Sequence, residues 1–123
     1  MSTSDYRIAW RIYGANNVDL QLPSALKEPL IAAQSAKCKI YVQGIQFLPS
    51  VFTGTTLGFV DSLTGKLIGS FVIPPTAAGW YATPLDFGPN GTPLTKGANL
   101  LMSGSANGQL HIDAYQKPTR MGR

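Results

Sequence analysis

The feature that most constrains the fold is the density of turn-forming residues. Thirteen glycines and nine prolines are spread over the 123 residues of the chain. Proline removes a backbone donor and glycine favours turns, so together these residues interrupt long helices. Between them lie short runs in which apolar and polar residues alternate with a period of two, which is typical of half-buried strands. The sequence therefore predicts a compact domain of short strands joined by turns.

The alternating runs predict an all-β fold: one antiparallel β-sandwich, or a jelly-roll-like domain, of about eight short strands. Strands at spacings of roughly 8–12 residues are typical of such folds. The expected strands cover residues 6–13, 18–22, 37–48, 56–60, 67–73, 79–81, 98–106 and 109–116. The stretch 23–36 is Ala-rich and interrupted by Pro29, and we expect it to be irregular.

Three positions indicate how the strands are joined. Gly44 interrupts the long run 37–48 and predicts a β-bulge. Residues 61–66 predict a hairpin turn in which Gly65 adopts a positive φ. Asn107-Gly108 predicts a type I′ turn that joins 98–106 and 109–116 as a hairpin, because Asn-Gly between alternating runs is the strongest short hairpin signal.

The ends of the chain and its charge set the expected organisation. We expect a flexible N-terminal arm at residues 1–5, a β-sandwich domain at 6–117 and a basic C-terminal tail at 118–123. The N-terminus lacks a basic region followed by an apolar stretch, so no secretory signal is predicted and synthesis in the cytoplasm is expected. The net charge is +4 without a dense basic run, which argues against a nucleic-acid partner. The apolar stretches are too short to span a membrane.

The titratable residues predict neither catalysis nor a cofactor. The single cysteine, Cys38, alternates with Ile40 and Val42 and is expected to be a buried hydrophobic residue. With one cysteine and one histidine, a metal centre built from these residues is not expected. His111 shares a strand face with Asp113, which favours a surface or interface pair over a catalytic dyad. Nucleophile-elbow, phosphate-loop and EF-hand motifs are missing from the sequence, so we expect a non-enzymatic protein.

A shortage of charge points instead to contacts with other chains. Charged residues make up 13% of the sequence, against roughly a quarter in typical domains. Tryptophan, tyrosine and arginine are the usual anchors of protein interfaces. The candidate interface residues are Arg7, Trp10, Arg11, Trp80, Tyr81, Lys117, Arg120 and Arg123. Of these, Trp10 also fits a core position, and Trp80 and Tyr81 fit the core and an interface equally well.

Two segments carry a resemblance to a known class of proteins. They read GFVDSLTGKLIGSFVIPPTA, over residues 58–77, and LDFGPNGTPLTKGANLLMSGSANGQLHIDAYQKP, over residues 85–118. The hairpin on a Thr-Gly pair, the Leu-Asp-Phe-Gly-Pro stretch and the closing His-Ile-x-Ala-Tyr strand resemble small structural proteins of tailed bacteriophages. The resemblance covers about residues 40–118, and its motifs are turn and core residues.

This resemblance implies a virion component, most simply a decoration or cement protein on the capsid surface. Its expected partners are the major capsid protein and further copies of itself, as a homotrimer, with the N-terminal segment or the tail as contact arm. An alternative is a receptor- or glycan-binding module of a phage tail or fibre, with exposed Trp80 and Tyr81 as a stacking platform. The two hypotheses differ in whether these aromatic residues face solvent or another protein.

Overall fold

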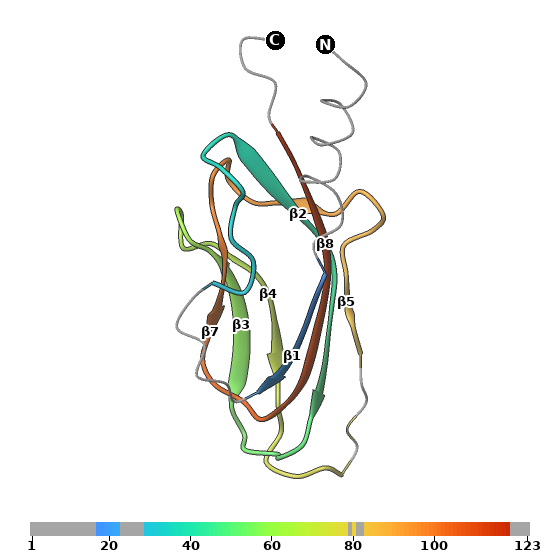
Figure 1. Cartoon of the computed structure of the whole chain (residues 1–123). Coiled ribbons are helices and arrows are strands. Elements are labelled where there is room, and N and C mark those ends of the chain that lie inside the picture. The colour runs from blue at the N-terminus through green and yellow to red at the C-terminus, as the bar shows by residue number, and fades with distance from the viewer. Residues whose placement is uncertain (1–16, 23–28, 79, 81–82, 119–123) are drawn as a thin grey trace.

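Two antiparallel sheets packed face to face form the part of the protein that the structure describes (Figure 1). The computed structural model describes residues 17–22, 29–78, 80 and 83–118. All regular structure in these ranges is β, in eight strands, so the predicted all-β sandwich is confirmed. The jelly-roll connectivity stays a prediction. The expected arm 1–5, the expected strand 6–13 and the tail after Pro118 lie outside the described residues.

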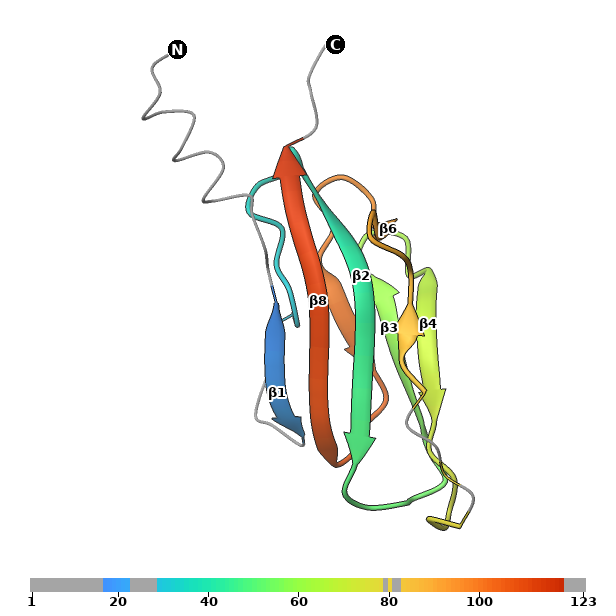
Figure 2. The same cartoon turned by 90° about the vertical axis from the view of Figure 1, so that its right-hand side faces the viewer.

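The larger sheet has five strands, and the two longest of them lie side by side at its centre (Figure 2). Its main path runs β1 (Val18–Leu22), β8 (Gly108–Pro118), β2 (Cys38–Pro49) and β5 (Leu85–Asp86), and β6 (Thr92–Pro93) also pairs with β2. The strands β2 and β8 stay in register over almost their whole length. The side chains of β2 and β8 therefore make up most of the outer face of the larger sheet.

The smaller sheet has three strands in the order β4-β3-β7. These strands are β3 (Thr56–Asp61), β4 (Leu67–Val72) and β7 (Leu100–Ser103). The predicted hairpin between β3 and β4 is confirmed, because the Gly65 amide donates to the Asp61 carbonyl over 2.8 Å and Gly65 has a φ of +72°.

The hydrophobic core lies between the two sheets, and every second side chain of the long strands points into it. The predicted alternation at Cys38, Ile40 and Val42 is confirmed, since all three side chains are fully buried. Bulky core residues come from both sheets: Leu22, Ile40, Ile45, Leu57, Phe59, Ile73, Leu94, Leu100, Leu110 and Ile112. Phe71 links the layers, with ring centroids 5.9 Å from Phe59 and 6.1 Å from Phe47. Because the side chains alternate along each strand, those that do not point into the core lie on the outer faces of the sheets.

The predicted bulge in β2 is confirmed. The register with β8 shifts between Val42 and Gly44, which leaves Gln43 as the extra residue. The Gln43 side chain turns away from the ladder and donates to the carbonyl of Pro89 over 2.8 Å. The bulge resets the alternation, so Gln46 and Leu48 point to the outside of the sheet while Ile45 and Phe47 point to the core.

The prediction of a hairpin at Asn107-Gly108 is wrong. Strand β7 is shorter than expected and pairs with β3, whereas β8 pairs with β2 and β1, so the dipeptide joins two different sheets. Among the described residues only glycines have a positive φ, so Asn107 lacks the conformation of a type I′ turn. Gly108 is required for space, since a Cβ there would collide with the Leu48 carbonyl and lie 2.7 Å from the Pro49 Cα.

Two further predictions concern residues outside the named strands. Of the stretch 23–36 that is expected to be irregular, residues 23–28 lie outside the described residues, and 29–36 are irregular apart from one bridge between Ile31 and Leu100. The buried Gln116 side chain holds this stretch by accepting from the Gln34 amide and donating to the Ala32 carbonyl, each over 2.9 Å. In the expected strand 79–81, Trp80 is not in a strand, and its two neighbours lie outside the described residues.

Candidate functional site

The outer face of the larger sheet carries many polar and charged side chains, and we refer to it as the polar face. It consists of the outward side chains of β1, β8 and β2: Asp19, Gln21, Lys39, Tyr41, Gln46, Leu48, Gln109, His111, Asp113, Tyr115 and Lys117. Antiparallel pairing arranges them in rows across the sheet, because residues in register lie side by side on one face. One such row is Asp19, His111 and Gln46.

His111 lies between two carboxylates at the centre of the polar face. Its Nδ1 lies 2.6 Å from Oδ1 of Asp19, and its Nε2 lies 2.9 Å from Oδ1 of Asp113. Hydrogen bonds to Asp19 and then Asp113 raise the pKa of His111 above its ordinary value, against a smaller lowering by burial. Because each carboxylate accepts from one ring nitrogen, the arrangement favours the doubly protonated imidazolium.

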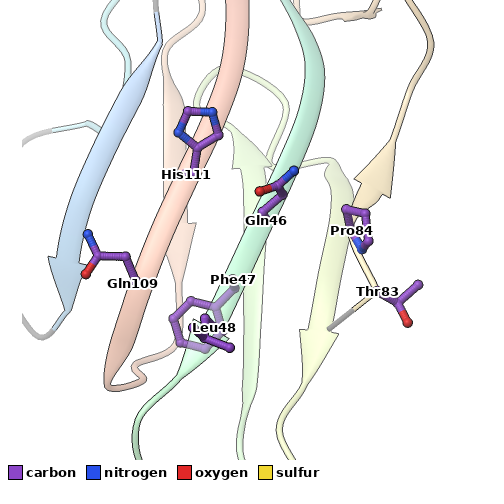
Figure 3. A pocket seen from close by; sticks show the side chains of 7 residues that line it. All are labelled: Gln46, Phe47, Leu48, Thr83, Pro84, Gln109 and His111. Atoms are coloured by element: carbon purple, nitrogen blue, oxygen red, sulfur yellow. The ribbon is translucent and has the colours of Figure 1, made fainter. Parts of the chain in front are cut away.

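A hollow of about 440 Å³ opens beside this cluster (Figure 3). Two pairs of residues in register form one side of it, Gln46 with His111 and Leu48 with Gln109. The segment that leads into β5 forms the other side, with Thr83 and Pro84. Phe47 completes the lining. The hollow therefore combines amide groups with apolar surface.

A second cluster lies on the polar face toward the end of β8. The rings of Tyr41 and Tyr115 stack across the strands with centroids 5.0 Å apart and an interplanar angle of 6°. The Lys117 ammonium lies 5.1 Å from the centroid of Tyr41, within cation–π range. The Tyr115 hydroxyl donates to the Asn90 carbonyl over 2.7 Å. Tyr41 and Tyr115 therefore already make their aromatic and hydrogen-bond contacts with residues of the same chain.

The outer face of the smaller sheet has the opposite character, and we refer to it as the apolar face. It consists of small and apolar side chains: Thr56, Gly58, Val60, Leu67, Ser70, Val72, Leu101 and Ser103. Leu67 and Val72 are exposed, at 54% and 68%. Leu67 lies over Gly58, since its Cδ1 is 2.9 Å from where a Cβ on Gly58 would be. The result is a sheet face without outward charge that carries two exposed aliphatic side chains.

The only charged residue in β3, β4 and β7 is Asp61, and it points inward. Its carboxylate accepts from the backbone amides of Leu63, Thr64 and Thr95 over 2.8, 3.2 and 2.7 Å. Burial raises the pKa of Asp61, but the hydrogen bonds from Thr95, Leu63 and Thr64 together hold it below its ordinary value. Asp61 therefore stabilises the β3–β4 turn and adds no charge to the apolar face.

Two of the eight candidate interface residues fall in the described residues. Lys117 is exposed at the end of β8. Trp80 is half-buried, with its ring edge-on to Phe52 at a centroid distance of 5.8 Å. Its indole nitrogen is buried and has no hydrogen-bond partner among the residues described. Arg7, Trp10, Arg11, Tyr81, Arg120 and Arg123 lie outside the described residues.

The side chains of His111 and Cys38 both make polar contacts within the chain. Both ring nitrogens of His111 are engaged by carboxylates, so neither is free to act as a base. Cys38 is fully buried, and its sulfur lies 3.3 Å from the Ser35 hydroxyl. In the ranges that the structure describes, no cluster of His, Cys, Asp and Glu fits a metal ion, and no helix is suited to crossing a bilayer.

No protein-family model matches the chain, and no curated protein matches it significantly. The surfaces of the two sheets therefore remain the guide to what this protein binds.

Sequence reasoning had not singled out Asp19, Gln46 and Gln109 on the polar face or Leu67 on the apolar face. Alternation alone places Gln109 outward. The proximity of Asp19 to His111 depends on a strand pairing that spans 92 residues of sequence.

Proposed function

We propose that the protein is a non-enzymatic structural protein of a bacteriophage virion, a capsid decoration protein that also binds copies of itself. The observation that carries this proposal is the apolar face. An uncharged sheet face with exposed Leu67 and Val72 is suited to burial against another protein. The resemblance of residues 58–77 and 85–118 to phage structural proteins supplies the virion context.

The size of the apolar face suggests how such a protein binds. Three strands about 4.8 Å apart and some 20 Å long cover roughly 300 Å². Burying that area contributes at most about 7 kcal/mol, whereas association costs about 4–15 kcal/mol, and stable interfaces bury about 800 Å² per partner. One apolar face alone therefore gives weak association. Repetition of the contact over a symmetric shell multiplies it through avidity.

The test is occupancy on phage heads that lack the protein, measured by sedimentation and gel densitometry. The key variant is Leu67→Glu, which places a charge on the apolar face. The matched control is Leu48→Glu, because Leu48 is 60% exposed and lies on the opposite sheet. We expect the parent chain and Leu48→Glu to bind alike and Leu67→Glu to lose at least about tenfold in affinity, since a buried unpaired charge is costly.

Failure of the intact chain to bind heads would overturn the virion role. Equal binding of Leu67→Glu and the parent chain would overturn the apolar face as the contact and favour the expected arms at the two ends.

A further inference from the structure

We propose that the hollow on the polar face is a binding site for a neutral saccharide. The inference is independent of the apolar face and of the capsid role. At about 440 Å³, the hollow is within the range of small-ligand pockets. Figure 3 shows that its lining comes from β2, β8 and the segment before β5, so three parts of the chain converge on it.

The hollow offers an apolar surface that the fold itself does not use. Leu48 is 60% exposed and Pro84 is also exposed, and the two residues lie on opposite sides of the hollow. Removal of such surface from water is favourable. The C–H groups on the face of a pyranose ring are suited to this contact, while the ring edge remains polar.

The amide side chains supply the complementary polar groups. The side chains of Gln46 and Gln109 are exposed, and among the described residues neither side-chain amide has a hydrogen-bond partner. Each amide carries a carbonyl acceptor and an NH₂ donor. Adjacent hydroxyls of a sugar both donate and accept, so one amide can pair with two of them. Two amides on neighbouring strands fit a ligand with several hydroxyl groups.

The charges around the hollow favour a neutral ligand. Asp19 and Asp113 flank His111, so with a protonated imidazole the cluster has an excess of one negative charge. Such an excess disfavours a carboxylate, phosphate or sulfate ligand. The same excess would attract an organic cation, but the lining of the hollow holds no carboxylate to pair with it directly. A ligand whose polar groups are hydroxyls is not repelled by the negative charge and needs no carboxylate as a partner.

The lining is held in place before a ligand arrives. The β2–β8 register fixes Gln46 beside His111 and Leu48 beside Gln109. The two carboxylates hold both nitrogens of His111 and so limit rotation of the ring. A rigid lining lowers the entropy cost of binding. The openness of the site, with both amides exposed, still indicates weak binding, with dissociation constants of about a millimolar.

The experiment is a titration of the isotope-labelled protein followed by ¹⁵N–¹H NMR. The probes are methyl glycosides of glucose, galactose, mannose, rhamnose and N-acetylglucosamine, with glucuronate and choline as charged comparators. We expect at least one neutral glycoside to shift the side-chain NH₂ signals of Gln46 and Gln109. Saturation of these shifts gives the dissociation constant.

Matched variants separate the hollow from the rest of the surface. Gln109→Ala is expected to weaken binding about fivefold or more, since it removes hydrogen bonds to the ligand. Gln34→Ala is its control, because Gln34 is an exposed glutamine outside the hollow, and it should bind as the parent does. Leu48→Ala is expected to weaken binding, whereas Val72→Ala on the apolar face should not.

Three outcomes would overturn the proposal: no shift with any neutral glycoside, stronger binding of glucuronate or choline, or equal loss in Gln109→Ala and Gln34→Ala. Unchanged backbone signals in each variant show that it is folded. Capsid occupancy depends on Leu67 in the test above, so either proposal can fail while the other stands.

Discussion

The Nδ1 atom of His111 lies 2.6 Å from Oδ1 of Asp19, which is 92 residues earlier in the chain. This contact ties the edge strand β1 to the central strand β8 on the polar face. The second ring nitrogen lies 2.9 Å from Asp113 on β8 itself. The His111 side chain thus links β8 to β1 through a contact whose strength depends on the protonation of the imidazole, and so on pH.

We expect the Asp19–His111 contact to make stability depend on pH. The pKa of His111 is raised in the folded protein, so its contribution is fully present below the unfolded value of about 6.5. The contribution is lost as the pH rises through the folded pKa. Because Asp19 is largely exposed, the contact contributes roughly 0–1 kcal/mol to the free energy of unfolding.

The measurement is urea unfolding of the parent and of His111→Asn at about pH 6 and pH 9. The parent should lose more stability than the variant between these values. Equal losses in both proteins would show that other groups cause the pH dependence.

Alternation within a strand was enough to predict much of the polar face. The run 109–116 correctly placed His111 and Asp113 together on the outside, and the run from Cys38 to Val42 correctly placed its apolar residues in the core. The period of two is a local property of an extended backbone, so it can be read from sequence. The position of Asp19 could not be predicted, because it depends on the register of two strands distant in sequence.

Asp61→Ala is expected to destabilise the fold by about 3 kcal/mol or more. It removes the shared acceptor of the Leu63, Thr64 and Thr95 amides, and hydrogen bonds to a charged group are worth about 1.5–3 kcal/mol each. The control is Asp86→Ala, because Asp86 is exposed and accepts from the Gly88 amide. Denaturant unfolding at neutral pH gives both values, and a similar small loss in the two variants would contradict the role of Asp61.

Acid should reproduce part of this loss in the parent. The pKa of Asp61 is lowered on folding, so its stabilisation is present above the unfolded value of 3.8 and is lost as the pH falls through the folded pKa. Unfolding measured between about pH 5 and pH 2 should show a steeper decline in the parent than in Asp61→Ala. Parallel curves would show that protonation of Asp61 is not involved.

Gly108→Val is expected to destabilise the protein by at least about 2 kcal/mol, because the new side chain meets the backbone of Leu48 and Pro49. Gly65→Ala is the control, since Gly65 also has a positive φ but has no atom within 4 Å of the added Cβ. Its cost should be about 1 kcal/mol, from backbone conformation alone. Thermal unfolding compares the two, and an equal effect would exclude close packing as the reason for glycine at position 108.

The same glycine shows why the hairpin prediction failed. Asn-Gly is a strong local signal for a two-residue turn between paired strands, but β7 and β8 find other partners in different sheets. Close approach of the β2 backbone, not a type I′ turn, requires Gly108. Local turn chemistry identified where the chain changes direction and left the strand partners undetermined.

Self-association through the apolar face should resist salt. The strands that form this face contribute no outward charge, and Asp61, their only charged residue, is buried. Raising salt from about 0.05 M to 1 M shortens the Debye length from about 14 Å to 3 Å, which weakens contacts between exposed charges but not apolar burial. Sedimentation velocity at high protein concentration should therefore show the same or greater association at 1 M salt, and Val72→Glu should reduce it under both conditions. Dissociation of the parent chain by salt would instead place the contact on charged residues of the polar face, with Lys117 the first residue to substitute.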